Sequence, residues 1–302
     1  ALRGRGERRL ASFLFRVFRF LLKSNTLVAL GGGGLALAGG LAQGLEPSLS
    51  LVAVPFFYLY TGHILNHFLD RRAAAYNDPD RARFYIKHRF YLVTTAVLAA
   101  CLGLFQSARL GTVPFWSFAV LAGLGLVYPI RLVPARWEHL VRYTKLKDFP
   151  GSKPLSIGLA WGAVCALWPS LSFANTLSLA GGGLFVLIGT LAFARAALFD
   201  VLDIQGDLVV GKETLAISLG EDRSSSLLKA LSAGIVVLAA AATALGWLGP
   251  AGLVLGLAPV SLGAVIVAYQ KRKLLPGIFL EGLVEASLLL AGALALLIVA
   301  LR

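Results

Sequence analysis

Long apolar runs separated by short polar segments are the main feature of this chain. Nine segments approach the roughly 20 apolar residues that a helix needs to cross the hydrocarbon core of a bilayer. They cover residues 26–43, 50–67, 90–108, 112–129, 154–170, 176–199, 226–246, 249–269 and 283–301. This pattern predicts an all-α, polytopic membrane protein with a bundle of about nine transmembrane helices.

Glycine runs occur inside two of these segments, GGGG at 31–34 and GGG at 181–183. Glycine weakens a helix in water because it has more backbone freedom to lose on folding. Between helices in lipid, it instead lets two backbones approach each other closely. We therefore expect both runs to lie where helices pack tightly.

Composition agrees with a membrane protein. Of the 302 residues, 58% are hydrophobic and 14% are charged, whereas soluble domains are about 45–50% apolar and about 25% charged. The mean hydropathy is +0.79. Cys101 and Cys165 both fall in apolar runs, so we expect them to be buried packing residues and not a disulfide or metal site. A soluble domain with a single core is excluded.

The net charge of +13 would suggest nucleic-acid binding in a soluble protein. In a membrane protein, it instead reflects retention of Lys and Arg in cytoplasmic loops. Of the 28 Lys and Arg residues, only Arg109 and Arg302 fall on the opposite side of the predicted spans. We therefore predict an odd number of spans, a cytoplasmic amino terminus, an external carboxy terminus and no nucleic-acid partner.

Residues 1–25 have a different pattern from the rest of the chain. Basic residues alternate there with phenylalanine and leucine, which predicts an amphipathic helix on the anionic surface of the bilayer. The chain is thus expected to have a basic interfacial helix at 1–25 and a transmembrane domain at 26–302. The basic residues of the helix include Arg8, Arg9, Arg16, Arg19 and Lys23.

Two acidic clusters lie at the cytoplasmic ends of predicted spans. In HILNHFLD, residues 63–70, Asn66 and Asp70 are four residues apart and share a helix face. In FDVLDIQGD, Asp200, Asp203 and Asp207 share a face if the sixth span continues through them. Three like charges on one face repel each other, and oxygen ligands of this kind suit Mg²⁺. Alternatively, the acids pair with Lys and Arg of the loops.

Basic side chains near these clusters could hold an anion beside the metal. The candidates are Arg71, Lys145, Lys147, Lys153 and Lys212, with Tyr128 and Tyr143 as residues that line a cavity beside them. Each lysine has the alternative of being a solvated loop charge, and each tyrosine of being ordinary packing. His63 and His67 are four residues apart, and could bind a transition metal with Asp70 or form hydrogen bonds with neighbours in the bundle, which we favour.

The two clusters and the nine-span layout resemble the UbiA superfamily of intramembrane prenyltransferases. DVLDIQGD is similar to the second Asp-rich box of that family at Asp203 and Asp207, with Asp200 as its upstream extension. GKETLAISLG at 211–220 resembles the continuation of this box, and VYP at 127–129 the exit of the fourth helix. The first box keeps Asn66 and Asp70 but has His67 and Ala74 where the family has aspartates. Asp78 is a possible replacement, although YNDPDR resembles a turn.

This resemblance implies a membrane-embedded enzyme that moves an isoprenyl group from a prenyl diphosphate to an aromatic or other lipophilic acceptor. The acceptor itself is not set by the sequence. Asp70, Asp203 and Asp207 would be catalytic, and Mg²⁺ would be the cofactor. Two alternatives stay open: a non-catalytic relative that binds isoprenoid lipids, and a cation-coupled transporter, which would have broken helices and deeply placed charges. Most acids lie at helix ends, with Glu285 as the main exception. The implied metal ligands are Asn66, Asp70, Asp200, Asp203 and Asp207.

Overall fold

The computed structural model describes residues 2–69, 75–128 and 149–301, with side chains from Arg9 onward. Within this part of the chain the structure is helical and has no strand, which confirms the all-α prediction. The helices are α1 Leu2–Lys23, α2 Thr26–Ala42, α3 Leu49–Leu69, α5 Pro79–Lys87, α6 Arg89–Leu110, α7 Thr112–Val127, α8 Ser152–Gly162, α9 Trp168–Phe173, α10 Leu179–Leu202, α11 Ile204–Val209, α12 Leu215–Leu219, α13 Glu221–Ala244, α14 Gly252–Gln270 and α15 Ile278–Ala300. A π-helical turn, Ala163–Leu167, joins α8 to α9.

Each of the nine predicted apolar segments forms a helix. In the described residues, seven helices are long and apolar enough to cross a membrane, counting α8 to α9 as one. The other two are shorter: α2 has 17 residues and α7 has 16. At 1.5 Å per residue these two reach only about 24–26 Å, compared with about 30 Å for a hydrocarbon core. The chain is an integral membrane protein with a helical bundle.

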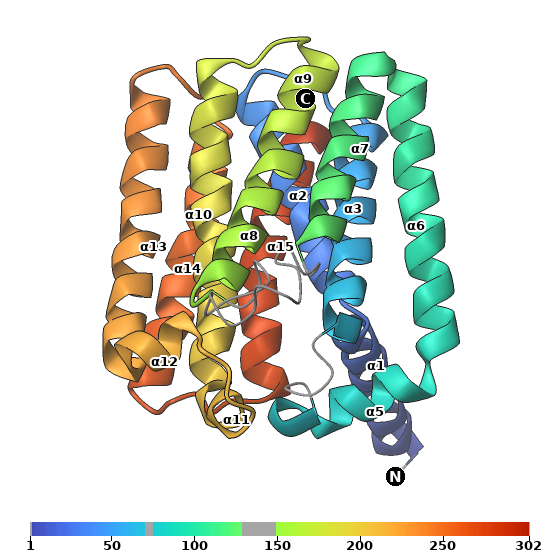
Figure 1. Ribbon diagram of the computed structural model, residues 1–302, viewed down its shortest axis with the longest axis vertical. Coiled ribbons are helices and arrows are strands. Elements are labelled where there is room, and N and C mark those ends of the chain that lie inside the picture. The colour runs from blue at the N-terminus through green and yellow to red at the C-terminus, as the bar shows by residue number, and fades with distance from the viewer. Residues whose placement is uncertain (1, 70–74, 129–148, 302) are drawn as a thin grey trace, which may run out of the picture.

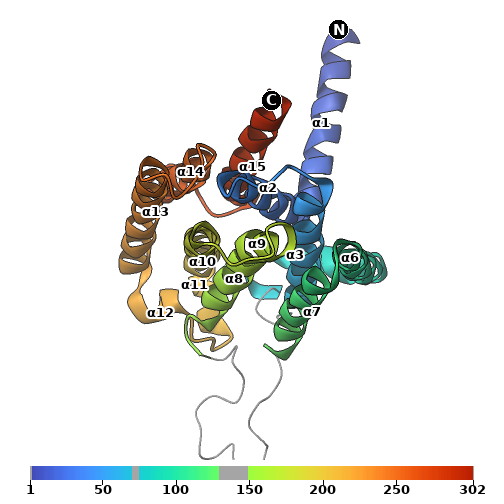
Figure 2. The same cartoon turned by 90° about the horizontal axis from the view of Figure 1, so that it is seen from above.

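Helices α2 and α10 lie inside the bundle and are flanked by other helices on several sides (Figure 2). In α2 every residue from Leu35 to Ala42 is buried. The glycine run of α2 packs closely as predicted, because a Cβ on Gly34 would lie 2.6 Å from the Cα of Gly292 in α15. The second run differs: Gly181 is tightly packed against Ser170, whereas Gly182 faces open space.

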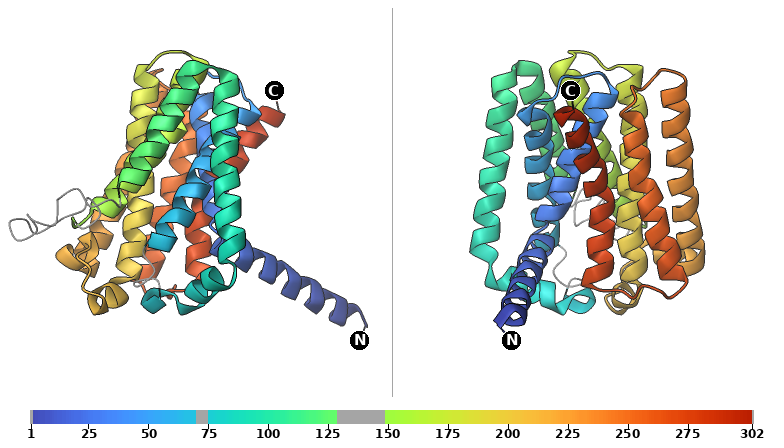
Figure 3. Two further views of the ribbon diagram at one scale, coloured as in Figure 1. Left: turned by 45° about the vertical axis from the view of Figure 1, so that its right-hand side comes forward. Right: turned by 180° about the vertical axis from the view of Figure 1, so that it is seen from behind.

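The two ends of the bundle carry different elements (Figure 1). The amino terminus lies at the end that carries α5, α11 and α12, and the carboxy terminus lies at the opposite end. Helix α1 projects sideways from the bundle (Figure 3) and is bent by 72° from α2. Its Phe15 ring stacks on Phe279 at the start of α15, with ring centroids 6.0 Å apart. Side chains such as Leu10 and Phe13 remain exposed.

The two cysteines have different surroundings. Cys165 is buried in the π-helical turn and its Sγ lies 3.4 Å from the carbonyl oxygen of Gly32. Cys101 is exposed on the outer surface of α6, so the expectation that both are buried is wrong for Cys101. Neither forms a disulfide.

The contact between α2 and α15 can be tested with alanine substitutions. We expect Gly34→Ala to lower the stability of the bundle by about 1–3 kcal/mol, because its methyl group would overlap the backbone of Gly292. The matched control is Gly182→Ala, which places the same methyl group in open space and should cause no loss. Thermal unfolding in detergent compares the two. Equal stability of the two variants would contradict the proposed close contact.

Candidate functional site

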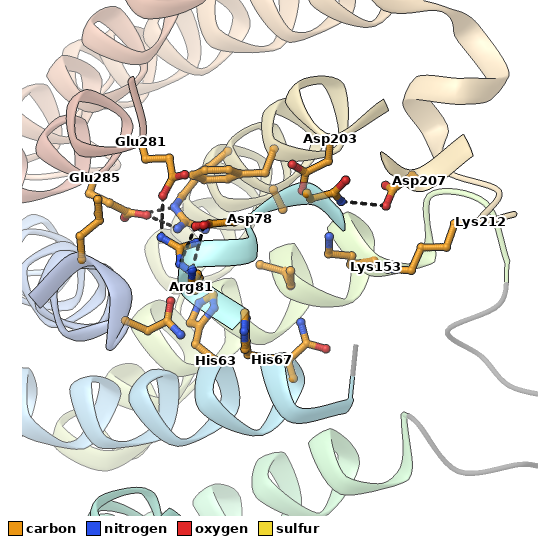
Figure 4. Close-up of a pocket in the computed structure, with 18 residues that line it drawn as sticks. His63, His67, Asp78, Arg81, Lys153, Asp203, Asp207, Lys212, Glu281 and Glu285 are labelled. Atoms are coloured by element: carbon orange, nitrogen blue, oxygen red, sulfur yellow. Dashed lines mark hydrogen bonds and ion pairs between the residues drawn. The ribbon is translucent and has the colours of Figure 1, made fainter. Parts of the chain in front are cut away.

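A cavity of about 190 Å³ opens at the end of the bundle that carries α5 and α11. Its wall is rich in charged and amide side chains that come from several helices and from the segment before α5 (Figure 4). The lining residues are Leu22, Asn25, His63, Asn66, His67, Asn77, Asp78, Arg81, Lys153, Ile157, Arg195, Ala196, Phe199, Asp203, Asp207, Lys212, Glu281 and Glu285. The fold therefore gathers polar groups from distant parts of the sequence at one membrane-edge site.

The second acidic cluster does not lie on one continuous helix, as the sequence suggested it might. Helix α10 ends at Leu202, Asp203 lies at the break, and α11 begins at Ile204. Asp203 and Asp207 both line the cavity, but Asp200 does not. The carboxylate of Asp200 is only 1% exposed and forms an ion pair with Lys153 across 2.9 Å. Asp200 thus lies outside the cavity lining, although its charge is close enough to raise the pKa of both Asp203 and Asp207.

The two remaining carboxylates lie in an environment that opposes their negative charge. Burial raises the pKa of Asp203 to about 6; the nearby charges of Asp207, Asp200 and Glu281 also raise it, and Lys153 opposes them. The pKa of Asp207 is likewise raised, mainly by burial, with Lys212 acting against the shift. Because the local lysines do not offset these effects, a bound cation would be strongly favoured between these groups.

The structure describes only part of the first acidic cluster. Asn66 lines the cavity, whereas Asp70, Arg71 and Ala74 lie outside the described residues. The His67 ring is tilted by 33° against that of Tyr85 with ring centroids 3.7 Å apart, and His63 packs edge-on against Trp161. Among the described residues, no three His, Cys, Asp or Glu side chains form a ready-made metal cluster. Both histidines thus lie beside aromatic rings in the bundle, and the hydrogen bonds that we favoured for them stay a prediction.

The segment before α5 brings two further oxygen-bearing side chains to the cavity. Asp78 caps α5 by accepting a hydrogen bond from the backbone of Arg81 at 2.8 Å, so the predicted turn also starts a helix. The Asn77 side chain donates to Oδ1 of Asp207 at 3.1 Å. This contact needs a glycine in α11, because a Cβ on Gly206 would lie 1.6 Å from Asn77 Oδ1. Asn77 was not predicted from the sequence, because no spacing pattern points to it.

Two ion pairs complete the wall on the side of α15. Arg81 pairs with Glu281 at 2.5 Å, and its Nε lies 3.6 Å from Asp78. Deeper in the bundle, Arg195 of α10 binds both carboxylate oxygens of Glu285. The sequence held a signal for this deeper pair, because charged residues inside apolar spans are rare and are usually functional. Glu285 was noted on this ground, but Arg195 was missed.

The predicted cations and tyrosines divide into three groups. Lys153 and Lys212 line the cavity, as expected. Lys145, Lys147 and Tyr143 lie outside the described residues. Tyr128 does not line the cavity, and its hydroxyl lies 3.4 Å from Oγ of Ser152. The lysines that the structure places at the cavity therefore come from the start of α8 and from the segment after α11.

The residues that line the cavity suit a hard divalent cation with an anionic ligand. Asn66, Asp78, Asp203 and Asp207 offer oxygen donors, and Mg²⁺ usually takes one or two carboxylates together with water and phosphate oxygens. Lys153 and Lys212 lie on the same side of the cavity as Asp203 and Asp207 (Figure 4). Chemically, this arrangement can hold a diphosphate at the edge of an apolar bundle.

Comparison with known proteins finds relatives of this chain among curated sequences. No family model matches the chain. It is 31% identical over 232 residues to a digeranylgeranylglyceryl phosphate synthase of Halobacterium salinarum, with 74% of this chain and 75% of the relative covered. A synthase of the same name from Natronomonas pharaonis is 30% identical over 237 residues, 76% of each chain.

Solved structures show the same fold. An apo UbiA homologue from Aeropyrum pernix K1 matches with a TM-score of 0.67 and 16% identity, covering 89% of this chain and 97% of the homologue. A UbiA homologue from Archaeoglobus fulgidus bound to GPP and Mg²⁺ matches with a TM-score of 0.55 and 16% identity, covering 91% and 98%. The protein is thus a membrane-embedded prenyltransferase. The chain belongs to the UbiA superfamily.

The hydrogen bond between Asn77 and Asp207 can be tested by removing it in two ways. Asn77→Ala deletes the donor, and Gly206→Ala pushes the donor away. Each change should lower the free energy of unfolding by about 1.5–3 kcal/mol, as for a hydrogen bond to a charged group. Both substitutions remove the same interaction. The free energy of unfolding of the double variant should therefore be no lower than that of the less stable single variant. Additive losses in thermal unfolding would show that the two residues act independently.

Proposed function

We propose that this enzyme transfers an isoprenyl group from a prenyl diphosphate to a hydroxyl group of a glyceryl phosphate lipid. The main support is the joint placement of Asp203, Asp207, Lys153 and Lys212 at one membrane-edge cavity. A diphosphate needs its charge neutralised before its bond to an allylic carbon can break. The surrounding bundle provides an apolar, water-poor environment for the isoprenyl chain and the cationic carbon that forms.

The cofactor in this proposal is Mg²⁺. Asn66, Asp78, Asp203 and Asp207 would hold it, together with Asp70 as the resemblance implies. When bound, the ion neutralises charge on the diphosphate as it leaves. The first Asp-rich box has Ala74 where the family has its last aspartate. In this proposal, Asp78 supplies the carboxylate that is missing there. Asp70, Asp203 and Asp207 remain our predicted catalytic residues.

Lys153 and Lys212 are assigned to the diphosphate. The buried carboxylate of Asp200 holds Lys153 at the cavity wall through a 2.9 Å ion pair. We therefore reassign Asp200 from metal ligand to positioning residue for this lysine. Arg71, Lys145 and Lys147 remain further candidates for diphosphate binding on sequence grounds, and Tyr143 for the cavity wall.

The acceptor class is suggested by the relatives, which are named for digeranylgeranylglyceryl phosphate. A compound of that name carries two geranylgeranyl groups on a glyceryl phosphate. Making it from a glyceryl phosphate with one such chain forms an ether at a free hydroxyl group. We infer that this chain takes an acceptor of the same class.

This function can be tested with purified protein, Mg²⁺ and radiolabelled geranylgeranyl diphosphate. Geranylgeranylglyceryl phosphate should yield a labelled ether and an equal amount of pyrophosphate. A hydroxybenzoate and a naphthoate serve as alternative acceptors of the aromatic class. Labelling of an aromatic acceptor and not of the glyceryl phosphate would overturn the acceptor assignment. Tight donor binding without turnover on any acceptor would indicate a non-catalytic protein.

The different roles of Asp203 and Asp200 predict different variant behaviour. Asp203→Asn should abolish Mg²⁺-dependent binding of a non-reactive prenyl diphosphate analogue and reduce transfer by about 10³-fold, in the range found when one electrostatic group is lost. Asp200→Asn should keep the dependence on Mg²⁺ but weaken donor binding by about tenfold, because Lys153 is no longer held in place. Calorimetric titration of the analogue, with and without Mg²⁺, separates these outcomes. Identical loss in both variants would return Asp200 to the metal site.

We also propose that the cavity end faces the cytoplasm and that the carboxy terminus lies outside. Residues 1–25, which include α1, would form a basic interfacial unit on the inner membrane surface. Support comes from the charge asymmetry: the loop at 271–273 and the amino-terminal helix carry Lys and Arg at the cavity end, whereas the opposite loops are nearly uncharged. The exposed apolar side chains of α1 suit an interfacial position.

Single cysteines can test this orientation in a background with Cys101→Ser and Cys165→Ala. We expect a membrane-impermeant maleimide to label Thr176→Cys, in the loop before α10, on intact cells. Ser226→Cys, in the first turns of α13, should be labelled only after the cells are permeabilised. Both positions are exposed and lie at opposite ends of the bundle. The reverse labelling pattern would contradict the cytoplasmic placement of the cavity.

A further inference from the structure

The buried pair of Arg195 and Glu285 is the most unusual charge arrangement in the bundle. Glu285 lies seven residues after the start of α15, and Arg195 lies seven residues before the end of α10. At 1.5 Å per residue, both are about 10 Å inside the ends of their helices. Their side chains are 5% and 8% exposed, so this is a charge pair placed well within the apolar part of the protein.

Stability alone gives little reason to keep such a pair. The desolvation of two buried charges offsets much of their mutual attraction, and apolar replacements of similar size are often as stable. Arg195 also lies beside two aromatic rings, with its guanidinium carbon 4.9 Å from the ring centroid of Phe199 and 6.0 Å from that of Trp161. The surrounding structure thus fixes Arg195, which in turn fixes the carboxylate of Glu285.

The carboxylate of Glu285 faces the cavity and retains capacity for another hydrogen bond. Arg195 donates once to each of its oxygens, and each carboxylate oxygen can accept two hydrogen bonds. Glu285 also lines the same cavity as the acids and lysines assigned to the diphosphate. It lies on the opposite side of that cavity from Lys212 (Figure 4). A donor bound through its diphosphate would therefore leave space for the acceptor on the side of Glu285.

We propose that Glu285 binds the reacting hydroxyl group of the acceptor and takes up its proton, while Arg195 positions the carboxylate. The proposal rests on the function proposed above. As the bond between the allylic carbon and the diphosphate breaks, its electron pair leaves with the diphosphate. The acceptor oxygen forms the new bond to that carbon, and its proton passes to Glu285. The proton passes to water before the next turnover.

A paired carboxylate suits this task although it is a weak base. The hydroxyl group becomes strongly acidic once its oxygen has begun to bond to a cationic carbon, so a strong base is unnecessary. What the reaction needs is an acceptor for the proton at the correct place and a site that prefers the hydroxyl group of the lipid to water. Without Glu285, the cationic carbon would still form, but capture by the lipid hydroxyl group would be slow and water would compete.

The test measures how the isoprenyl group is partitioned between two products. Wild-type and Glu285→Gln enzymes are incubated with geranylgeranyl diphosphate, Mg²⁺ and geranylgeranylglyceryl phosphate, and the ether and free prenyl alcohol are quantified separately. We expect Glu285→Gln to lower ether formation by at least about 10²-fold, as for loss of a general base. The amount of free prenyl alcohol formed per pyrophosphate released should rise. The control Glu221→Gln removes a carboxylate that pairs with Arg272 outside the cavity lining, and it should keep the wild-type ratio of ether to alcohol.

A second variant guards against simple misfolding. Removing one member of a buried pair leaves an unpaired charge, whereas neutralising both avoids it. The double variant Arg195→Gln with Glu285→Gln should therefore unfold at a temperature closer to wild type and still favour the alcohol. A wild-type ratio of ether to alcohol in both variants would refute the role of Glu285. Parallel loss of ether and pyrophosphate would assign the pair to donor activation or structure instead. Failure of the wild-type enzyme to form any ether would refute the proposed function itself, and this inference with it.

Discussion

The cost of burying carboxylates at the edge of an apolar bundle is the constraint on which the site depends. An ionised carboxylate is stable there only with a partner of opposite charge or with several hydrogen bonds. Three acids around the cavity have such partners: Asp200 pairs with Lys153, Glu281 with Arg81 and Glu285 with Arg195. Much of the positive charge near the cavity is therefore already paired with these three carboxylates.

Asp203 and Asp207 are left with less compensation than their surroundings require, as the raised pKa of each shows. A protein can relieve this by binding protons or by binding a cation. The oxygen donors and lysines beside them favour a cation that carries an anionic ligand. The other ion pairs therefore matter to the site because they prevent neighbouring basic side chains from satisfying these two acids.

Much of this fold could be predicted from the sequence, because long apolar segments are required by the thickness of the bilayer. The same segments could not show that α2 and α7 are short, since helix ends depend on local caps and turns. Asp203 and Asp207 were identified by their spacing and by resemblance to a family box. Asp200, which was grouped with them, does not line the cavity and pairs with Lys153, a contact that spacing along the chain could not show. Asn77 could not be predicted, since it reaches Asp207 only through the folded position of α11.

The structure also bears on the alternative of a transporter. That alternative would place broken helices near the middle of the bundle, around a cation site. In the described residues, the sharply bent pair of apolar helices is α1 with α2, which meet at the cavity end of the bundle. The break between α10 and α11 is at that same end. Apart from the π-helical turn Ala163–Leu167 between α8 and α9, the breaks in the described helices are thus concentrated where the site meets the polar membrane surface. This arrangement suits an enzyme that holds a charged diphosphate at the membrane surface and keeps the isoprenyl chain within the bundle.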